Sequence, residues 1–236
     1  MSNSTQTSSK ASSLVIRSAI VAAVGGLIFG FDTAVISGAN AALKVQFNLD
    51  DGGLGATVAI ATVGTIVGAL IGGRSADRFG RRKLLFFIGI LYVLGALGTA
   101  LAPSHLVLMI FRFVGGVGVG LSSVCAPIYT AEIAPAKVRG RLVGLVQFNI
   151  VLGILVAYLS NYIVAQIVHD PQIAWRWMLG VMVVPSVLFL AFLMVVPETP
   201  RWLMAKGREE EAIAISRRLC NTVEESDEQV QEIRNQ

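Results

Sequence analysis

Long apolar stretches alternate with short polar segments along most of the chain. Six of these stretches are nearly free of charge, and they cover residues 14–43, 54–73, 84–102, 106–131, 142–168 and 174–196. A helix rises about 1.5 Å per residue, so about 20 apolar residues are enough to cross the hydrocarbon core of a bilayer. The pattern therefore predicts six membrane-spanning helices and an all-α membrane protein.

The two ends of the chain are polar. Residues 1–13 are rich in Ser, Thr, Asn and Gln, lack the apolar core of a secretory signal, and are predicted to be disordered. Pro197 ends the last apolar stretch, and apolar residues recur at helical spacing in the charged tail that follows. We therefore divide the chain into a disordered cytoplasmic N-terminus (1–13), a six-helix transmembrane domain (14–197) and short cytoplasmic helices (198–236).

Composition supports a membrane protein. Hydrophobic residues make up 54% and charged residues 14% of the chain, and the mean hydropathy is +0.69. A soluble domain carries about 25% charged residues. Of the two cysteines, one stands in an apolar stretch and one in the tail, so the sequence suggests neither a disulfide framework nor a metal site.

The basic residues gather on one side of the predicted membrane. The segments on that side hold, among others, Arg17, Arg74, Arg78, Arg81, Arg82, Lys83, Lys137, Arg139 and Arg141. The opposite segments hold only Lys44 and Arg176. By the positive-inside rule, we expect a multi-pass protein of the cytoplasmic (inner) membrane with both termini in the cytoplasm. Membrane orientation also accounts for the basic pI without binding to nucleic acid.

Two ionisable residues stand inside predicted spans, Asp32 in the first and Arg112 in the fourth. Charge within a bilayer is costly, so such residues usually face a protein interior or an aqueous pathway. A carboxylate whose pairing with an arginine changes with conformation can couple proton movement to transport. The alternative is a static ion pair that orders the bundle. Counted along the helices, the two residues differ in depth by about 9 Å, and a bend at Gly25, Gly26 and Gly30 is expected to help them meet.

Carboxylates and arginines recur where three spans end on the cytoplasmic side. These positions are Asp77, Arg78, Gly80, Arg81 and Arg82 after the second stretch, Glu132 and Arg139 after the fourth, and Glu198 and Arg201 after the sixth. Exposed ion pairs contribute little, so one interpretation is charge that anchors the helix ends at the membrane surface. The other is a network that locks one conformation and releases in another. Spacing leaves both open.

Four motifs resemble those of the sugar porter family of the major facilitator superfamily. Residues 73–82 are similar to the superfamily's signature between helices two and three, and residues 197–203 (PETPRWL) to the sugar porters' hallmark after helix six. Residues 112–120, 127–129, 132 and 139–140 resemble their fourth-helix pattern, and residues 29–38 resemble the first helix of bacterial sugar–proton symporters. The resemblance implies the N-terminal half of a major facilitator fold, a six-helix bundle built as a 3+3 inverted repeat.

The resemblance also implies roles for individual residues. Asp32 matches the family's proton-coupling carboxylate and Arg112 its arginine partner. Gln147 matches a sugar-hydroxyl ligand, for which its amide supplies donors and an acceptor, although an interhelical hydrogen bond is the alternative. Phe29 matches an aromatic residue that lines the pocket. Ile154 stands where some sugar porters carry a second glutamine, so the sugar, hexose or pentose, stays open.

The expected function is sugar transport by alternating access, as a sugar–proton symporter with the proton as coupling ion and no other cofactor. The partners would be the sugar, the lipid bilayer, and the missing C-terminal half or a second copy of the chain, because the family has two six-helix halves. A facilitative uniporter, a non-transporting sugar sensor and an inactive half-transporter are the alternatives. No nucleophile–base constellation suggests an enzyme, and His105 and His169 are expected to be solvated in external loops.

Overall fold

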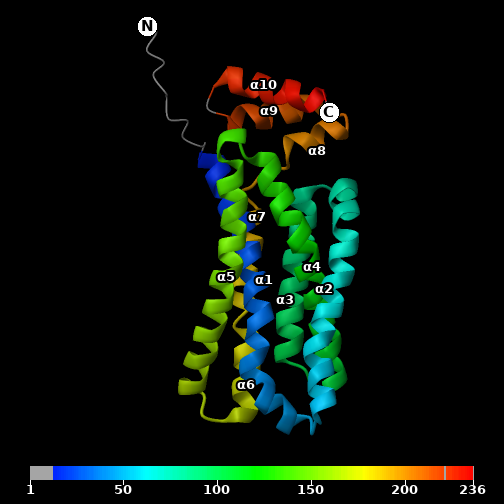
Figure 1. The fold of residues 1–236 in the computed structure, drawn as a ribbon, viewed down its shortest axis with the longest axis vertical. Coiled ribbons are helices and arrows are strands. Elements are labelled where there is room, and N and C mark those ends of the chain that lie inside the picture. The colour runs from blue at the N-terminus through cyan, green and yellow to red at the C-terminus, as the bar shows by residue number, and fades with distance from the viewer. Residues whose placement is uncertain (1–12, 221, 236) are drawn as a thin grey trace.

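The computed structural model describes residues 13–220 and 222–235, and every regular element within these ranges is a helix (Figure 1). The helices are α1 (Ser13–Gln46), α2 (Asp51–Phe79), α3 (Arg81–Ala100), α4 (His105–Ile133), α5 (Ala136–Ile167), α6 (Pro171–Gly180), α7 (Val183–Leu193), α8 (Pro200–Ala205), α9 (Glu209–Leu219) and α10 (Val223–Arg234). Six segments of this part of the chain are long and apolar enough to span a membrane. The prediction of a six-span all-α bundle is confirmed. The expected disorder of residues 1–13 falls outside the described residues, except for Ser13, which begins α1.

The sixth span consists of two helices rather than the single helix that we predicted. α6 ends at Gly180 and α7 begins at Val183, although the segment as a whole is long enough to cross the bilayer. Pro185 has no backbone N–H to donate to the carbonyl oxygen of Val181, which instead accepts from Val184 at 3.1 Å. The break is therefore a consequence of the proline one turn further on.

Two pairs of long helices pack backbone against backbone, α2 with α4 and α1 with α5. A Cβ atom added at Gly64 or Gly68 of α2 would overlap carbonyl oxygens of α4, and one added at Gly116 of α4 would overlap a carbonyl oxygen of α2. Gly30 of α1 and Gly153 of α5 meet the opposing backbone in the same way. Small residues allow such close approach within a bilayer. Each pair joins one helix of the first three-helix unit to one of the second, as an inverted repeat requires.

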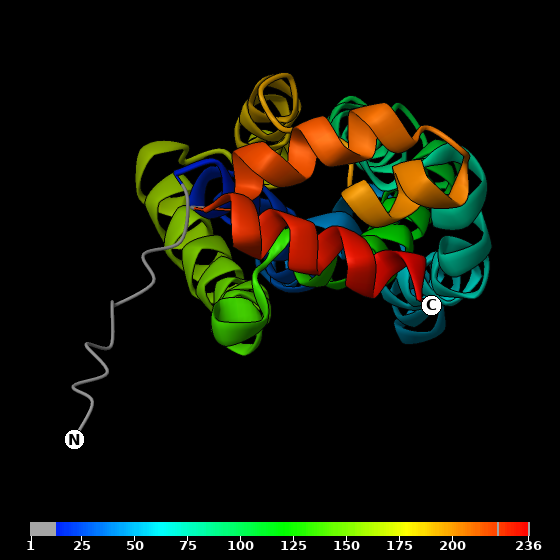
Figure 2. The same ribbon diagram turned by 90° about the horizontal axis from the view of Figure 1, so that it is seen from above.

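The three C-terminal helices lie across the end of the bundle at which α1 begins (Figures 1 and 2). Thr199 caps the start of α8: its side chain accepts a hydrogen bond from the N–H of Trp202, and Pro200 stands in the first turn. Trp202, Leu203 and Ala212 form a small core between α8 and α9. Besides this core, α8 contacts α4 and α9 contacts α1, so the C-terminal helices rest on the ends of these two spans.

Candidate functional site

Asp32 of α1 and Arg112 of α4 meet inside the bundle. Nη1 of Arg112 donates a hydrogen bond to Oδ1 of Asp32 at 2.8 Å, and the side chains of Arg112 and Asp32 are 5% and 8% exposed, respectively. Antiparallel packing sets the register, because Gly25 of α1 faces the side chain of Ser122 on α4. Seven residues further along α1, Asp32 therefore lies level with a position about one turn from Arg112.

The glycines of α1 at which a bend was expected lie within one uninterrupted helix. α1 is a continuous helix from Ser13 to Gln46, and Gly26 and Gly30 pack against the backbone of α5. The register set by Gly25 and Ser122 leaves about one helical turn between Asp32 and Arg112, and the long arginine side chain spans it. One donor of the arginine, Nε of Arg112, is buried without a hydrogen-bond partner among the described residues. The pair is thus desolvated and only partly saturated with hydrogen bonds.

The three residues matched to a sugar site lie along the seam between α1 and α5. Phe29 is half-buried against the core, next to Gly30, whose Cα faces the carbonyl oxygen of Ile150. Ile150 stands about one helical turn from both Gln147 and Ile154, on the same face of α5. Gln147 is exposed and makes no hydrogen bond to the described residues, whereas Ile154 packs partly buried on the core. The amide of Gln147 is therefore available to a ligand.

Arg81 is the centre of a polar cluster at the end of the bundle that carries α8–α10. Its Nη2 lies 2.9 Å from Asp77 Oδ1 and 2.9 Å from Glu132 Oε1, and its Nη1 donates to the carbonyl oxygen of Ala76 at 3.1 Å. Glu132 also accepts a hydrogen bond from the hydroxyl of Thr199 at 2.6 Å. One arginine thus joins the ends of α2 and α4 to the start of α8.

The side chain of Glu198 binds the backbone of the turn between α2 and α3. The Glu198 carboxylate accepts hydrogen bonds from the N–H groups of Arg81, Arg82 and Thr199, at 3.0–3.2 Å. Burial raises the pKa of Glu198, and these N–H donors act in the opposite direction. Gly80, at φ +97°, forms the turn, and a Cβ there would stand 2.5 Å from Oε2 of Glu198. Only glycine suits both the backbone angle and the close approach.

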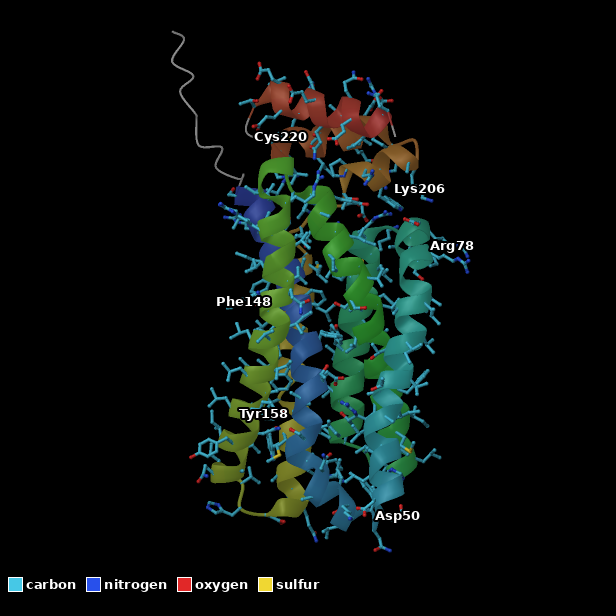
Figure 3. All side chains as sticks on the ribbon, viewed as in Figure 1. Asp50, Arg78, Phe148, Tyr158, Lys206 and Cys220 are labelled. Atoms are coloured by element: carbon cyan, nitrogen blue, oxygen red, sulfur yellow. The ribbon has the colours of Figure 1, made fainter. Side chains whose placement is uncertain are left out.

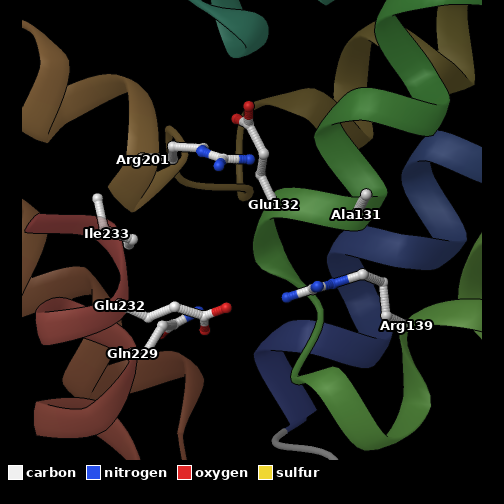
Figure 4. Close-up of a pocket in the computed structure, with 7 residues that line it drawn as sticks. All are labelled: Ala131, Glu132, Arg139, Arg201, Gln229, Glu232 and Ile233. Carbon is white, nitrogen blue, oxygen red and sulfur yellow. The ribbon is translucent and has the colours of Figure 1, made fainter. Parts of the chain in front are cut away.

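A pocket of about 110 Å³ adjoins this cluster, between α4, α5, α8 and α10 (Figure 4). Arg139 and Arg201 enter it from opposite sides, and Glu132, Gln229 and Glu232 complete its polar lining. Neither arginine forms an ion pair within the described part of the chain. Two of the nine residues expected in the cytoplasmic network therefore lie beside it with their charges unpaired.

Arg78 does not join the network. Its guanidinium lies over the ring of Phe79, 5.4 Å from the centroid, and the side chain projects away from the bundle (Figure 3). Gly80 separates α2, which holds Arg78, from α3, which begins at Arg81, so the two arginines point to different sides although they stand three residues apart. The expectation that Arg78 belongs to the cluster was wrong for this reason.

His105 is not a solvated loop residue, so that prediction was wrong. It is the first residue of α4, and its Nε2 lies 2.6 Å from Oγ1 of Thr57 on α2. That hydroxyl donates to the carbonyl oxygen of Gly53, so it accepts a hydrogen bond from the imidazole. The ring also packs against Phe47, with centroids 5.9 Å apart. His105 therefore ties together the ends of α1, α2 and α4 opposite to α8–α10.

Several residues of the cluster were not singled out from the sequence. The hydroxyl of Tyr129 donates to the carbonyl oxygen of Pro197 at 2.9 Å, and Nε1 of Trp202 donates to that of Asp77 at 2.9 Å. Thr199 links Glu132 to α8. A threonine directly before a proline is a helix-start signal, which marks Thr199 as a capping residue. Tyr129 and Trp202 donate to backbone carbonyl groups, and no pattern of residue types in the sequence indicates such contacts.

Comparison with known proteins gives consistent results along the chain. The family described as "Sugar (and other) transporter" matches residues 18–236. Over 212 residues the chain is 41% identical to the putative metabolite transport protein YwtG of Bacillus subtilis (strain 168), covering 90% of this chain and 45% of that protein. Over 254 residues it is 38% identical to the D-xylose-proton symporter of Escherichia coli (strain K12), covering 95% of this chain and 51% of that protein.

The fold is similar to a solved structure as well. The major facilitator superfamily proton:xylose symporter XylE, bound to 6-bromo-6-deoxy-D-glucose, superimposes with a TM-score of 0.89 at 38% sequence identity. The match covers 94% of this chain and 53% of that one. The chain thus spans about half the length of the relatives that it matches.

Proposed function

Because the chain belongs to the sugar (and other) transporter family, we propose that it forms one six-helix half of a sugar–proton symporter that works by alternating access. The observation that carries this proposal is the buried ion pair between Asp32 and Arg112. A charge pair in the middle of a membrane bundle usually marks an ion or substrate pathway. Similarity to a D-xylose-proton symporter supports the choice of sugar and proton.

In this mechanism the proton binds to Asp32. The neutral carboxyl no longer attracts the guanidinium of Arg112, and the ion pair at 2.8 Å is lost. The free energy of the α1–α4 contact therefore depends on protonation, as coupling of proton and sugar movement requires. Gln147 donates to and accepts from a sugar hydroxyl, Phe29 packs on the sugar ring, and Ile154 closes the site without a polar contact.

The cluster around Arg81 serves as the gate on the cytoplasmic side. It is made of Asp77, Gly80, Arg81, Arg82, Glu132 and Glu198. Closure is stabilised by bonds between the ends of three spans, and opening requires that they break together, which gives two discrete states. Arg139 and Arg201 enter the neighbouring pocket with unpaired charge, and they are the arginines that can exchange partners when α10 moves.

The complete carrier has a second six-helix half, supplied by another segment or by a second copy of this chain. The sugar binds between the halves at mid-membrane. The chain lies in the cytoplasmic membrane with both termini inside, in keeping with the basic residues at the end that carries α8–α10. The proton is its only coupling ion, and it needs no other cofactor.

The test is uptake of labelled xylose and glucose by transport-deficient cells that express the chain, alone and together with the C-terminal half of the xylose symporter. Accumulation that a protonophore abolishes is the expected result. Asp32→Asn should stop accumulation but leave exchange of labelled for unlabelled sugar across the membrane. Asp227→Asn, the same change at an exposed position of α10, is the matched control and should leave both intact.

Other outcomes would separate the alternatives. Uptake that stops when the sugar concentrations inside and outside are equal, with or without the protonophore, would identify a facilitative uniporter. The apolar side chain of Ile154 would suit such a carrier. Sugar binding without any uptake or exchange would identify a sensor or an inactive half. Proton-driven accumulation by the Asp32→Asn variant would remove Asp32 from the coupling mechanism.

A further inference from the structure

An apolar groove runs along the outer surface between α2 and α3, near the end that carries α8–α10. Its volume is about 380 Å³, and its lining residues are Ile71, Ser75, Phe79, Lys83, Leu84, Phe87 and Leu121. The side chains of Ile71, Phe79 and Phe87 are each about half exposed. No described part of the chain covers this apolar surface, and the proposed mechanism does not use it.

The groove is a consequence of how α4 packs. α4 contacts α2 through Gly116 and α3 through Gly115, so it draws both helices to itself. α2 and α3 consequently touch each other little beyond their connecting turn, and Leu121 of α4 forms the floor between them. Ile71 lies eight residues from Phe79 along α2, which gives the groove a length of about 12 Å from the helix end into the bilayer.

Positive charge stands at the mouth of this groove. Lys83 is exposed and lines it, and Arg78 lies over the ring of Phe79, another lining residue. Arg74 is exposed one helical turn before Arg78. The nearest carboxylate on the same helix end, Asp77, is engaged by Arg81 at 2.9 Å. The mouth therefore has a net positive charge while the interior is apolar.

We propose that this groove is a binding site for one anionic phospholipid. An acyl chain fills the apolar part over Leu84, Phe87 and Leu121, and the phosphate lies between Lys83 and Arg78. A basic mouth above an apolar slot matches the two ends of such a lipid, and basic pockets between membrane helices bind anionic headgroups. A zwitterionic lipid can fill the same slot, but its own cation opposes the field of the two basic residues.

The preference for negative charge can be measured on the purified 236-residue chain. Native mass spectrometry in detergent compares binding of phosphatidylglycerol and phosphatidylcholine with identical acyl chains. Two basic residues should favour phosphatidylglycerol by about 25-fold, which corresponds to ~2 kcal/mol at about 1.4 kcal/mol per tenfold change. The Lys83→Gln/Arg78→Gln variant should reduce the ratio to nearly one. Lys206→Gln/Arg217→Gln, which removes the same charge from exposed positions of the C-terminal helices, should not change it.

A second measurement locates the acyl chain and does not depend on the charge variants. Phe87→Trp places a fluorophore in the groove, and Phe148→Trp places one on the exposed face of α5. Phosphatidylglycerol with brominated acyl chains should quench the tryptophan at 87 at lower lipid fractions than the one at 148. The proposal is overturned if wild type binds both lipids equally, if both double variants lower the ratio alike, or if the two tryptophans are quenched alike.

Discussion

The ion pair between Asp32 and Arg112 allows a quantitative test of how the bundle is held together. The perturbation is a double-mutant cycle of Asp32→Asn, Arg112→Gln and the two changes combined. Each single change leaves one buried polar group without its charged partner, because the two side chains are no more than 8% exposed. The double variant leaves two neutral amides that are able to bond to each other.

The magnitude follows from the geometry of the pair. Two unit charges 2.8 Å apart attract by about 6 kcal/mol at an effective dielectric constant of about 20. Much of this offsets desolvation, so removal of one partner from a buried pair costs about 3–5 kcal/mol. Nε of Arg112 already lacks a partner among the described residues, so little else compensates the guanidinium. The double variant should lose no more than about 1–2 kcal/mol, which gives a coupling energy of about 4 kcal/mol or more.

The assay is unfolding of the purified chain by SDS in mixed micelles, followed by far-ultraviolet circular dichroism. The free energy of unfolding is measured for the four proteins at neutral pH. Gln147→Ala changes an exposed residue of α5 that makes no side-chain hydrogen bond to the described chain, so it serves as a control and should alter the free energy of unfolding by about 0.5 kcal/mol or less.

Additive effects would refute this reasoning. If the double variant loses the sum of the two single losses, the two charges do not interact in the folded chain, and the pairing at 2.8 Å does not describe the protein in micelles. If Asp32→Asn alone stabilises the bundle, then the desolvation cost of the carboxylate outweighs its attraction to Arg112. The carboxylate would then serve transport and not stability.

Three further predictions address other parts of the chain. Gly120→Ala places a Cβ against the carbonyl oxygen of Thr65 and should lower the free energy of unfolding by about 1–3 kcal/mol. Gly73→Ala, at an open position, should not lower it. Equal losses for the two variants would exclude close helix contact as the cause. Burial raises the pKa of Glu198, so the stability that its protonated form contributes is fully present below the ordinary pKa of the carboxyl and is lost as the pH rises through the raised value. The melting temperature of wild type relative to Glu198→Gln should therefore fall as the pH rises above the ordinary pKa of a glutamate; a rising difference would contradict this. His105→Ala should lower the free energy of unfolding by about 1–2 kcal/mol, because it removes the hydrogen bond to Thr57 and the ring contact with Phe47. His169→Ala, at an exposed position, should leave it unchanged. Both are measured by the same SDS titration.

The spans could be predicted from the sequence because a bilayer imposes a length on every apolar helix. A run of about 20 uncharged, mostly apolar residues matches the thickness of the hydrocarbon core, and helices of soluble proteins rarely contain one. All six predicted stretches became spans. Gly64 and Gly68 form a stripe four residues apart, and such a stripe is typical of close helix contact, since a residue without a side chain leaves room for a neighbouring backbone. What the stripe did not specify was the partner, which depends on the packing of α4 against α2.

The polar clusters were harder to predict, because many of their bonds involve the backbone. Glu198 was placed with the arginines only because both recur at the span ends, and its carboxylate accepts hydrogen bonds from the backbone N–H groups of Arg81 and Arg82. Side-chain periodicity carries no information on such contacts. Arg78 and Arg81 looked equivalent in sequence, and the turn at Gly80, with φ at +97°, separates them in space.

The pairing of Asp32 with Arg112 depends on tertiary register in the same way. Neither depth nor spacing predicted it, and it follows from the contact between Gly25 and the side chain of Ser122. α1 is fixed to α5, and α4 to α2, by backbone contacts at glycines that do not slide without losing many close contacts at once. The α1–α4 contact that carries the ion pair therefore joins two rigid helix pairs. In the proposed mechanism, a charge change at that joint acts on both pairs together, so a proton on Asp32 alters how the two helix pairs pack against each other.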